Sequence, residues 1–147
     1  MHFSPAHLLA DDRATAARAA LSVLIVDDEP HVRSYLRMVL GALGVTEVWE
    51  AADGSDAIGL FQEHQPAVVL LDVNMPLLSG DETLRRLTTL DPGAAVIVVT
   101  SQNDFTTVKR FQELGAMGYV LKHVRREQIT ATLEELLDSL LDDRDED

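Results

Sequence analysis

The stretch Val68-Val69-Leu70-Leu71-Asp72 decides the fold of this chain, because four consecutive apolar residues end abruptly at an acid. Two other runs have the same form: residues 22–26 are followed by Asp27, and residues 95–99 are followed by Thr100. Such unbroken apolar runs are typical of strands that are buried on both faces in a parallel sheet covered by helices. Each run therefore predicts a central strand whose carboxyl end carries a polar side chain.

Helical patterns separate these runs. Apolar residues after Pro30 recur on one helical face, and Gly44 ends that pattern. The predicted strands are residues 22–26, 47–51, 68–71, 95–99 and 119–121, and the predicted helices are residues 30–43, 55–64, 81–90, 104–114 and a final apolar stripe from 129 to 141. Alternating strands and helices form a parallel sheet with right-handed crossovers. We predict an α/β fold: a doubly wound, flavodoxin-like (βα)5 sheet of strand order 2-1-3-4-5, with the strand at 47–51 near an edge.

The length of 147 residues suits one domain with one hydrophobic core. Residues 1–20 form an Ala-rich N-terminal arm with a helix start at Ser4-Pro5, and we expect it to be helical or partly disordered. Residues 21–141 form the folded domain, and residues 142–147 form an acidic tail that should fray. If the arm packs as a helix on a second copy, the protein forms a homodimer.

Composition excludes several classes of function. No apolar run approaches the roughly 20 residues of a membrane span, and the start of the chain is not a signal peptide, so we expect a cytoplasmic protein with no membrane partner. The net charge of -13 repels phosphate backbones, so we expect no nucleic-acid partner. The chain contains no cysteine, which excludes disulfides, thiolate metal sites and a cysteine nucleophile.

Polar residues follow four of the predicted strands. In strand order 2-1-3-4-5 the first and third strands are neighbours, so Asp27, Asp28 and Asp72 converge at one edge, where Thr100 and Lys122 follow the last two strands. Three carboxylates this close cannot all stay ionised without a cation. Their oxygen ligands suit Mg²⁺. A carboxylate beside Mg²⁺, a lysine and a hydroxyl is the set of groups that phosphoryl transfer to a carboxylate needs.

Each of these residues alone has a simpler interpretation. Asp27 and Asp28 could cap the helix that begins at Pro30, Thr100 could satisfy a turn, and Lys122 could be a solvated charge. An acidic pair, an acid, a hydroxyl and a lysine at four successive strand ends are improbable by chance, so the functional interpretation is favoured for the set.

Residues 22–141 resemble the receiver domains of two-component response regulators, in particular single-domain receivers similar to the chemotaxis regulator. The motifs that carry the resemblance are residues 26–30 (Val-Asp-Asp-Glu-Pro), residues 72–76 (Asp-Val-Asn-Met-Pro) with Gly80, residues 99–101 (Val-Thr-Ser) and residues 115–122 (Gly-Ala-Met-Gly-Tyr-Val-Leu-Lys). The resemblance implies that Asp72 is the phosphoacceptor. It also implies a Mg²⁺ site formed by Asp72, Asp28, the backbone carbonyl of Asn74, and Asp27 mainly through water.

The resemblance implies a switch as well. Lys122 would hold a phosphoryl oxygen, Thr100 would move to hydrogen-bond the phosphoryl group, and Tyr119 would swing inward behind it. That movement would change the surface of residues 104–141, through which a target protein binds. The simpler interpretation of Tyr119 is a plain core residue.

One residue departs from the family pattern. The family usually has a proline after its lysine, commonly with a cis peptide bond, whereas this chain has His123. A non-proline cis bond is costly, so we expect a trans bond here, and the placement of Lys122 comes into question. We expect His123 to be a surface residue, the other histidines (His2, His7, His31 and His64) to be solvated, and Trp49 to serve packing. Asn74 and Gln102 flank the expected site.

The sequence indicates a signalling protein, not an enzyme with a separate substrate: it catalyses only its own phosphorylation and dephosphorylation. A histidine kinase or phosphotransfer protein would donate the phosphoryl group, and an adaptor that binds its target when phosphorylated is the first choice. A phosphorelay intermediate or a phosphate sink is the alternative. An aspartyl-phosphate hydrolase is disfavoured because Asn74 stands where such enzymes need an acid. A flavin protein is disfavoured because the carboxylates would repel a flavin phosphate. The chain could also be the receiver part of a longer protein.

Overall fold

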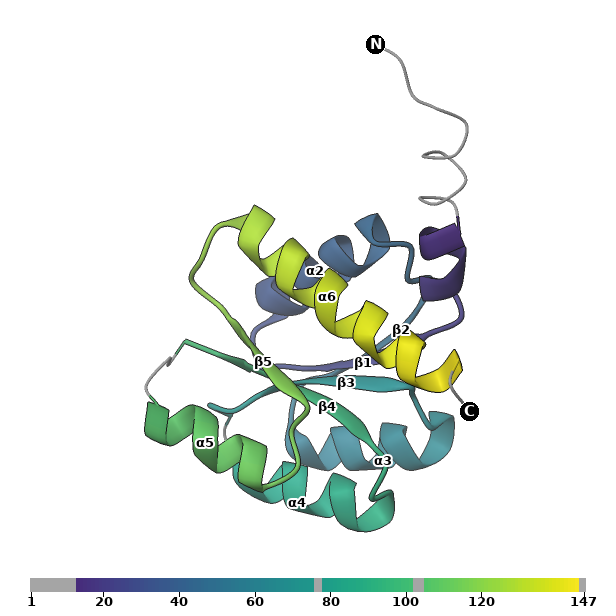
Figure 1. The fold of residues 1–147 in the computed structure, drawn as a ribbon. Coiled ribbons are helices and arrows are strands. Elements are labelled where there is room, and N and C mark those ends of the chain that lie inside the picture. The colour runs from purple at the N-terminus through teal and green to yellow at the C-terminus, as the bar shows by residue number, and fades with distance from the viewer. Residues whose placement is uncertain (1–12, 76–77, 102–104, 146–147) are drawn as a thin grey trace, which may run out of the picture.

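A computed structural model describes residues 13–75, 78–101 and 105–145 of the chain (Figure 1). The elements in chain order are β1 (Ser22–Val26), α2 (Pro30–Ala42), β2 (Glu47–Ala51), α3 (Gly54–His64), β3 (Val68–Asp72), α4 (Gly80–Leu90), β4 (Ala95–Thr100), α5 (Phe105–Glu113), β5 (Gly118–Leu121) and α6 (Arg126–Asp145). The predicted strands and helices are confirmed, and apart from α6 their described boundaries agree to within one residue. No described helix is long and apolar enough to cross a membrane.

The five strands form one parallel sheet of order β2-β1-β3-β4-β5, which confirms the predicted fold and the edge position of β2. The central strands β1, β3 and β4 are buried on both faces, as their apolar sequences predicted. Because the order reverses between β1 and β3, their carboxyl ends lie side by side, with Val26 paired to Leu71. That arrangement places the residues after both strands at one edge of the sheet.

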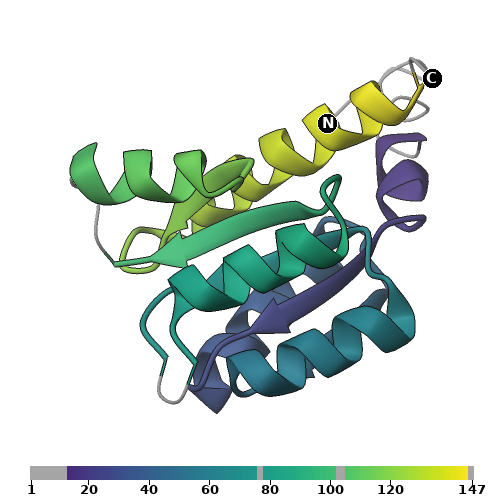
Figure 2. The ribbon, with the colours of Figure 1, turned by 90° about the horizontal axis from the view of Figure 1, so that it is seen from below.

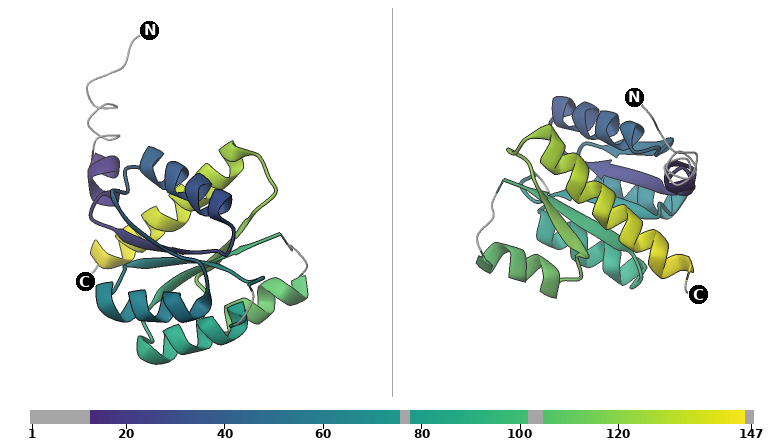
Figure 3. Two further views of the ribbon diagram at one scale, coloured as in Figure 1. Left: turned by 180° about the vertical axis from the view of Figure 1, so that it is seen from behind. Right: turned by 45° about the horizontal axis from the view of Figure 1, so that its top comes forward.

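Helices cover both faces of the sheet. In Figure 1 and in the left panel of Figure 3, α2 and α6 lie on one face, and α3, α4 and α5 lie on the other. Each layer has its own apolar core against the sheet. The first core contains Leu36, Val39 and Leu40 of α2 with Leu133 and Leu137 of α6. The second is built around Phe61 of α3, Leu84 and Leu87 of α4, and Phe111 of α5.

Specific residues in the sequence explain where the helices α2, α3 and α4 begin. The backbone of α2 begins at Pro30, whose fixed φ suits the first helical position. The side chains of Asp53 and Ser79 cap α3 and α4 by accepting hydrogen bonds from backbone N–H groups three residues on. Glycine is required at position 80, because a Cβ atom there would lie 2.6 Å from the Cα atom of Val73. The start of α4 therefore lies directly against the loop that follows Asp72.

Two details of the sequence interpretation are wrong. The last helix continues to Asp145, beyond the predicted end of its apolar stripe at residue 141. His64, expected to be solvated, stacks on Trp49 with ring centroids 4.4 Å apart and an interplanar angle of 12°. The half-buried ring of Trp49 confirms its packing role. His31 is exposed as expected, whereas His2 and His7 lie outside the described residues.

The end of the N-terminal arm is helical at residues 13–18 and packs against the domain, whereas the helix start expected at Ser4-Pro5 lies outside the described residues. Figure 2 shows this short helix beside the carboxyl-terminal half of α6. Gly44 has φ +101, and a Cβ atom there would lie 2.7 Å from Cγ2 of Thr15. Only glycine combines this left-handed backbone with so close an approach of the arm.

Arg18 joins the arm to two helices. Its guanidinium donates to both carboxylate oxygens of Asp138, at 2.9 and 3.1 Å, and to the backbone carbonyl of Leu43 at 3.2 Å. Glu134 lies 3.7 Å from the same guanidinium. Arg18 is only 7% exposed, so these contacts hold a buried charge. The arm, the end of α2 and the middle of α6 are therefore tied together by one side chain.

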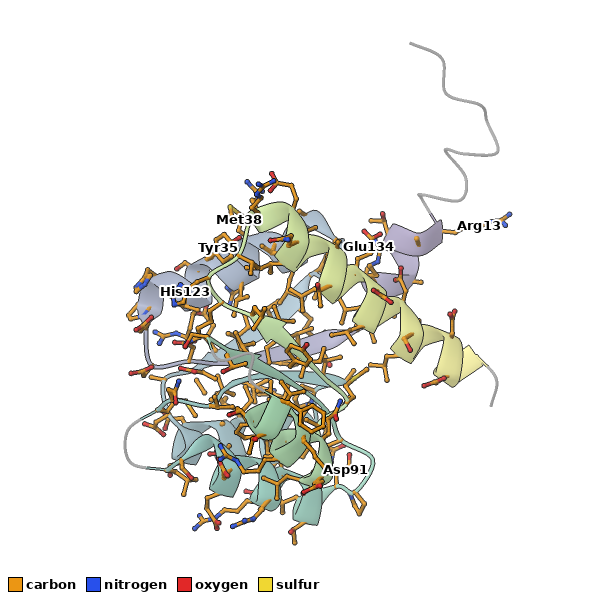
Figure 4. The ribbon with its side chains drawn as sticks, turned by 60° about the vertical axis from the view of Figure 1, so that its left-hand side comes forward. Arg13, Tyr35, Met38, Asp91, His123 and Glu134 are labelled. Atoms are coloured by element: carbon orange, nitrogen blue, oxygen red, sulfur yellow. The ribbon has the colours of Figure 1, made fainter. Side chains whose placement is uncertain are left out.

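We expect Arg18→Ala to lower the free energy of unfolding by about 2 kcal/mol. The substitution removes hydrogen bonds to a carboxylate and a carbonyl, although solvent at the half-exposed Asp138 reduces the contribution of the ion pair. In a chain of this length that corresponds to about 4–8 °C in melting temperature, measurable by circular dichroism. Arg13→Ala is the matched control, because Arg13 points away from the domain (Figure 4). Equal melting temperatures for the two variants would contradict the role given to Arg18.

Candidate functional site

The four strand ends bring the predicted site residues together. Asp27 follows β1, Asp72 ends β3, Thr100 ends β4, and Lys122 follows β5. The parallel register pairs Asp72 with Val99 and sets these ends level along one edge of the sheet. Asp27, Asp72 and Thr100 are each only 1% exposed. Two carboxylates and a hydroxyl are therefore buried at the carboxyl edge of an otherwise apolar sheet.

Lys122 bridges the two buried carboxylates. Its Nζ atom lies 3.1 Å from Oδ2 of Asp27 and 3.1 Å from Oδ1 of Asp72. The backbone N–H of Lys122 donates to the carbonyl of Thr100 at 2.8 Å, which fixes the residue to the end of β4. The lysine is placed as the sequence predicted, although His123 stands where the family has proline.

The peptide bond between Lys122 and His123 is trans, as expected for a non-proline residue, since no described peptide bond is cis. His123 is exposed, which confirms its interpretation as a surface residue. The ammonium group of Lys122 therefore contacts the carboxylates of Asp27 and Asp72 although the peptide bond to His123 is trans.

The carboxylates of Asp27, Asp28 and Asp72 form a group that suits a divalent cation. Each offers one oxygen, and these oxygens all lie within 4.8 Å of one another. Asp28 is exposed, so it lies at the mouth of the site, whereas the other two form its floor. Oδ2 of Asp72 is buried and accepts no hydrogen bond from any described residue. A buried carboxylate oxygen without a donor, in an all-oxygen cluster, fits a hard ion such as Mg²⁺.

Backbone groups orient the other carboxylate oxygens. Oδ1 of Asp27 accepts from the N–H of Glu29 at 2.9 Å, and Oδ1 of Asp72 accepts from the N–H of Asn74 at 3.1 Å. Each acid thereby closes a short turn onto its own loop, which fixes the direction of its remaining oxygen. Asn74 is exposed at the rim, and Gln102 lies outside the described residues.

The site shifts the pKa values of its central pair. Burial, and secondarily the nearby charge of Asp27, raise the pKa of Asp72 from 3.8 to about 6, against the opposing effects of the Asn74 N–H and Lys122. Burial alone would lower the pKa of Lys122, but Asp72 and Asp27 together raise it above its usual 10.5. At neutral pH Lys122 is therefore charged, and Asp72 is largely ionised at an energetic cost to the fold.

We expect this cost to appear as a pH-dependent difference in stability between the wild type and Asp72→Asn in EDTA. Because the folded pKa of Asp72 exceeds the unfolded value, protonation stabilises the fold, and this stability is lost as pH rises from about 4 through about 6. The neutral amide avoids the loss, so the variant gains stability relative to wild type by at most about 3 kcal/mol between pH 4 and pH 8. Urea unfolding at several pH values measures it. A difference that does not vary with pH would contradict the raised pKa, and Asp56→Asn, at an exposed helical position, is the control.

Sequence reasoning missed the residues that support the acidic loop. Nη1 of Arg33 donates to the backbone carbonyl of Asp27 at 2.8 Å, and its Nε pairs with Glu50 at 3.1 Å. Arg37, one turn further along α2, also pairs with Glu50, at 2.8 Å. Two arginines four residues apart on a predicted helix, near an acid in a predicted edge strand, were the available signal. They connect β2 and α2 to the backbone that carries Asp27.

The two residues predicted to act as a switch, Thr100 and Tyr119, lie at different depths. Thr100 is buried, whereas Tyr119 is 39% exposed, so the simpler interpretation of Tyr119 as plain core is wrong. Both residues line a cavity of about 10 Å³ beneath α5, together with Thr107 and Phe111. The structure thus shows Thr100 at the site and the tyrosine ring on the outer side of a small internal space.

Comparison with known proteins agrees with this geometry. A model of the response regulator receiver domain matches residues 23–134. The positive alginate biosynthesis regulatory protein of Pseudomonas aeruginosa is 38% identical over 116 residues, which cover 78% of this chain and 46% of that protein. The transcriptional regulatory protein HptR of Staphylococcus aureus is 33% identical over 122 residues, covering 82% of this chain and 48% of that protein. The chain thus spans about half the length of these curated relatives.

Solved structures give the same result. The chemotaxis protein CheY4 of Vibrio cholerae is similar with a TM-score of 0.72 and 28% identity, over 80% of this chain and 99% of that one. A CheX–CheY complex with BeF3 and Mg from Borrelia burgdorferi has a TM-score of 0.74 and 27% identity, over 82% of this chain and 88% of that one. With the family model matched over most of its length, the chain belongs to the response regulator receiver domain family of two-component systems.

Proposed function

We propose that this protein accepts a phosphoryl group on Asp72 in a Mg²⁺-dependent reaction and thereby switches its contacts with another protein. The observation that carries the proposal is the position of Asp72: buried at the end of β3, 3.1 Å from Lys122, and with one carboxylate oxygen that has no donor among the described residues. Membership of the receiver family and the similarity to a CheY protein complexed with BeF3 and Mg support it.

The residues that would hold Mg²⁺ are Asp27, Asp28, Asp72 and the backbone carbonyl of Asn74. When bound, the ion supplies positive charge that neutralises the transferring phosphoryl group and the crowded carboxylates. Asp28, at the mouth of the site, would bind directly, and the buried Asp27, already engaged by Lys122, would bind mainly through water. Arg33 and Glu50 hold the backbone of this acidic loop in place.

In the phosphorylation step, a carboxylate oxygen of Asp72 attacks phosphorus while the bond from phosphorus to the donor's leaving group breaks. Lys122 exchanges its contact with Asp72 for a phosphoryl oxygen and stabilises the added negative charge. Dephosphorylation is attack by water on the same phosphorus, with return of the carboxylate. The protein therefore catalyses only its own phosphorylation and dephosphorylation.

The added charge would then act on Thr100, whose hydroxyl donates to the phosphoryl group, and on Tyr119, which moves inward. The small cavity beneath α5 that both residues line would receive part of the ring. Residues 104–141, which include α5, β5 and most of α6, form the surface that changes. The exposed rings of Phe105 and Tyr119 lie on this surface.

The proposed partners are a histidine kinase or phosphotransfer protein as donor and a target protein that binds residues 104–141. If the protein is an adaptor, an affinity pull-down with the BeF3-treated protein recovers a protein that the untreated protein does not. If it is a relay intermediate or a phosphate sink, only the donor and a downstream phosphotransfer protein are recovered. Sedimentation of the chain with and without residues 1–20 tests the proposed homodimer. If both forms contain the same number of chains per particle at matched concentration, the arm does not mediate dimerisation and the homodimer proposal is contradicted.

Intact-mass spectrometry after incubation with acetyl phosphate tests the phosphorylation itself. We expect one added phosphoryl group in the presence of Mg²⁺ and none in EDTA, because the ionised cluster needs the cation before it accepts more negative charge. Rapid hydrolysis could hide the adduct, so binding of BeF3 in the presence of Mg²⁺ is measured in parallel. A folded protein with neither an adduct nor BeF3 binding would overturn the proposal in favour of a receiver that signals without phosphorylation.

A further inference from the structure

A groove of about 340 Å³ lies between α2 and the segment that runs from β5 into α6. We call it the α2–α6 groove. Its walls are mainly apolar: Val32, Tyr35 and Leu36 of α2 face Val120 of β5 and Ile129 of α6. The volume is in the range of small-molecule sites, and even a cavity of about 150 Å³ can hold a benzene ring. The groove is therefore large enough for one aromatic ring and its carboxyl group.

Two residues that line the groove also contact the acids of the proposed phosphorylation site, one by a hydrogen bond and the other by an ion pair. Glu29 lines it, and the backbone N–H of Glu29 donates to Oδ1 of Asp27. Lys122 also lines it, and its ammonium lies 3.1 Å from Oδ1 of Asp72. In Figure 4, two of the groove's lining residues, Tyr35 on α2 and His123 on the loop after β5, lie on the same side of the molecule. A ligand held at Asp72 could thus extend an apolar group into this space.

The charges at the groove select the kind of ligand. Lys122 and the cation site favour a negatively charged head at the inner end. The backbone of Glu29 lies at the inner end, but its carboxylate is half-exposed and lies 3.5 Å from the exposed ring of His31, so it adds negative charge on the solvent side of the groove and disfavours an anionic tail. A phosphoryl head with a neutral, apolar tail matches both ends.

We propose that the α2–α6 groove binds the aryl group of an aromatic acyl phosphate, such as benzoyl phosphate, that donates its phosphoryl group to Asp72. This inference rests on the proposed function of Asp72. In the step, an oxygen of Asp72 bonds to phosphorus, the bond from phosphorus to the acyl oxygen breaks, and benzoate leaves with the electron pair. No proton donor is needed, because benzoate is stable as an anion at neutral pH. The groove acts by holding the leaving group, which makes it a specificity determinant among small donors.

The first test compares benzoyl phosphate with acetyl phosphate as donors in Mg²⁺, by the rate at which the phosphoryl adduct of the intact protein forms. Burial of most of one ring corresponds to roughly a tenfold or greater gain in kcat/KM for benzoyl phosphate, after division by the spontaneous hydrolysis rate of each donor. If neither donor gives an adduct, the proposed function itself fails. If both phosphorylate Asp72 with equal corrected rates, only the groove proposal is overturned.

A filled groove provides the matched comparison. Val32→Trp places a large ring in the groove and should reduce the benzoyl-to-acetyl rate ratio about tenfold. Ser34→Trp adds the same side chain at an exposed position of α2 and should leave the ratio unchanged. If Val32→Trp does not fold by circular dichroism, Tyr35→Ala replaces it: the widened groove should raise the rate ratio of 2-naphthoyl to benzoyl phosphate at least threefold. The proposal is contradicted if folded Val32→Trp leaves the benzoyl-to-acetyl rate ratio unchanged or if Tyr35→Ala, used in its place, leaves the 2-naphthoyl-to-benzoyl ratio unchanged.

Binding is tested without the reaction by ¹⁵N–¹H NMR titration with benzylphosphonate, which cannot transfer its phosphoryl group. We expect saturable shifts at Tyr35, Leu36 and Ile129 that Val32→Trp abolishes and Ser34→Trp retains. Shifts confined to the loops around Asp72, or none at all, overturn the proposal.

Val32→Trp could instead slow transfer from a phosphohistidine protein with no change in the benzoyl-to-acetyl ratio. The groove would then serve a protein donor, and the acyl phosphate proposal would be wrong.

Discussion

Replacing Asp72 by asparagine is expected to abolish the phosphoryl adduct completely, at any concentration of acetyl phosphate and Mg²⁺. The amide offers no carboxylate oxygen to attack phosphorus, yet its size and shape match those of the acid. The fold should survive, because the amide removes a buried carboxylate whose pKa is raised by burial. Loss of the adduct would therefore report chemistry and not unfolding.

Intact-mass spectrometry measures this result, with circular dichroism to confirm the fold. Asp56→Asn is the matched control, since it removes the same charge at an exposed position of α3 and should keep the wild-type adduct. An adduct of unchanged yield on folded Asp72→Asn would show that another residue accepts the phosphoryl group.

Lys122→Met is expected to slow phosphorylation by a factor of roughly 10² to 10³ at saturating Mg²⁺. The ammonium lies 3.1 Å from a carboxylate oxygen of Asp72 and 3.1 Å from one of Asp27, and among the described residues it is the only side-chain cation paired with these two carboxylates. Methionine keeps the length of the side chain but supplies no charge for the phosphoryl oxygens. The variant also leaves two buried carboxylates without their cation, so it should be less stable in EDTA than in Mg²⁺.

The chain has a natural control for this experiment. Lys109 is its only other lysine, and it lies at an exposed position of α5 with its Nζ atom 5.8 Å from the ring centre of Phe105. Lys109→Met should phosphorylate at the wild-type rate, whereas Lys122→Arg should recover part of the loss. A rate for Lys122→Met within threefold of wild type would remove the lysine from the mechanism.

The sequence predicted the site well because each site residue stands at a sharp boundary. An apolar strand ends at Asp27, at Asp72 and at Thr100, so both the strand and the polar residue at its end are visible in one pattern. The order of the strands then follows from the βα alternation, which allows few topologies. Placing Lys122 was harder, since its strand is short and His123 departs from the family, but the trans peptide bond still brings the ammonium to the acids.

The supporting contacts could not be predicted in the same way. The bond from Arg33 to the carbonyl of Asp27 depends on the rotation of α2 relative to the sheet, which apolar periodicity fixes only roughly. The contact of Arg18 with Asp138 joins residues 120 positions apart, and no local pattern marks it. The continuation of α6 to Asp145 overrides the acidic composition of its last turn. Composition describes single residues, whereas these features depend on packing between elements.

The most direct test of the central claim is to locate the phosphoryl group on the chain. Acyl phosphates react with borohydride, which converts the modified aspartate to homoserine and leaves a permanent change of mass in one peptide. After incubation with acetyl phosphate and Mg²⁺, we predict that tandem mass spectrometry finds homoserine at position 72, and that samples treated in EDTA contain only aspartate there. Homoserine at position 27 or 28 with aspartate at 72, or a stable adduct that resists borohydride, would contradict the assignment of Asp72 as the phosphoacceptor.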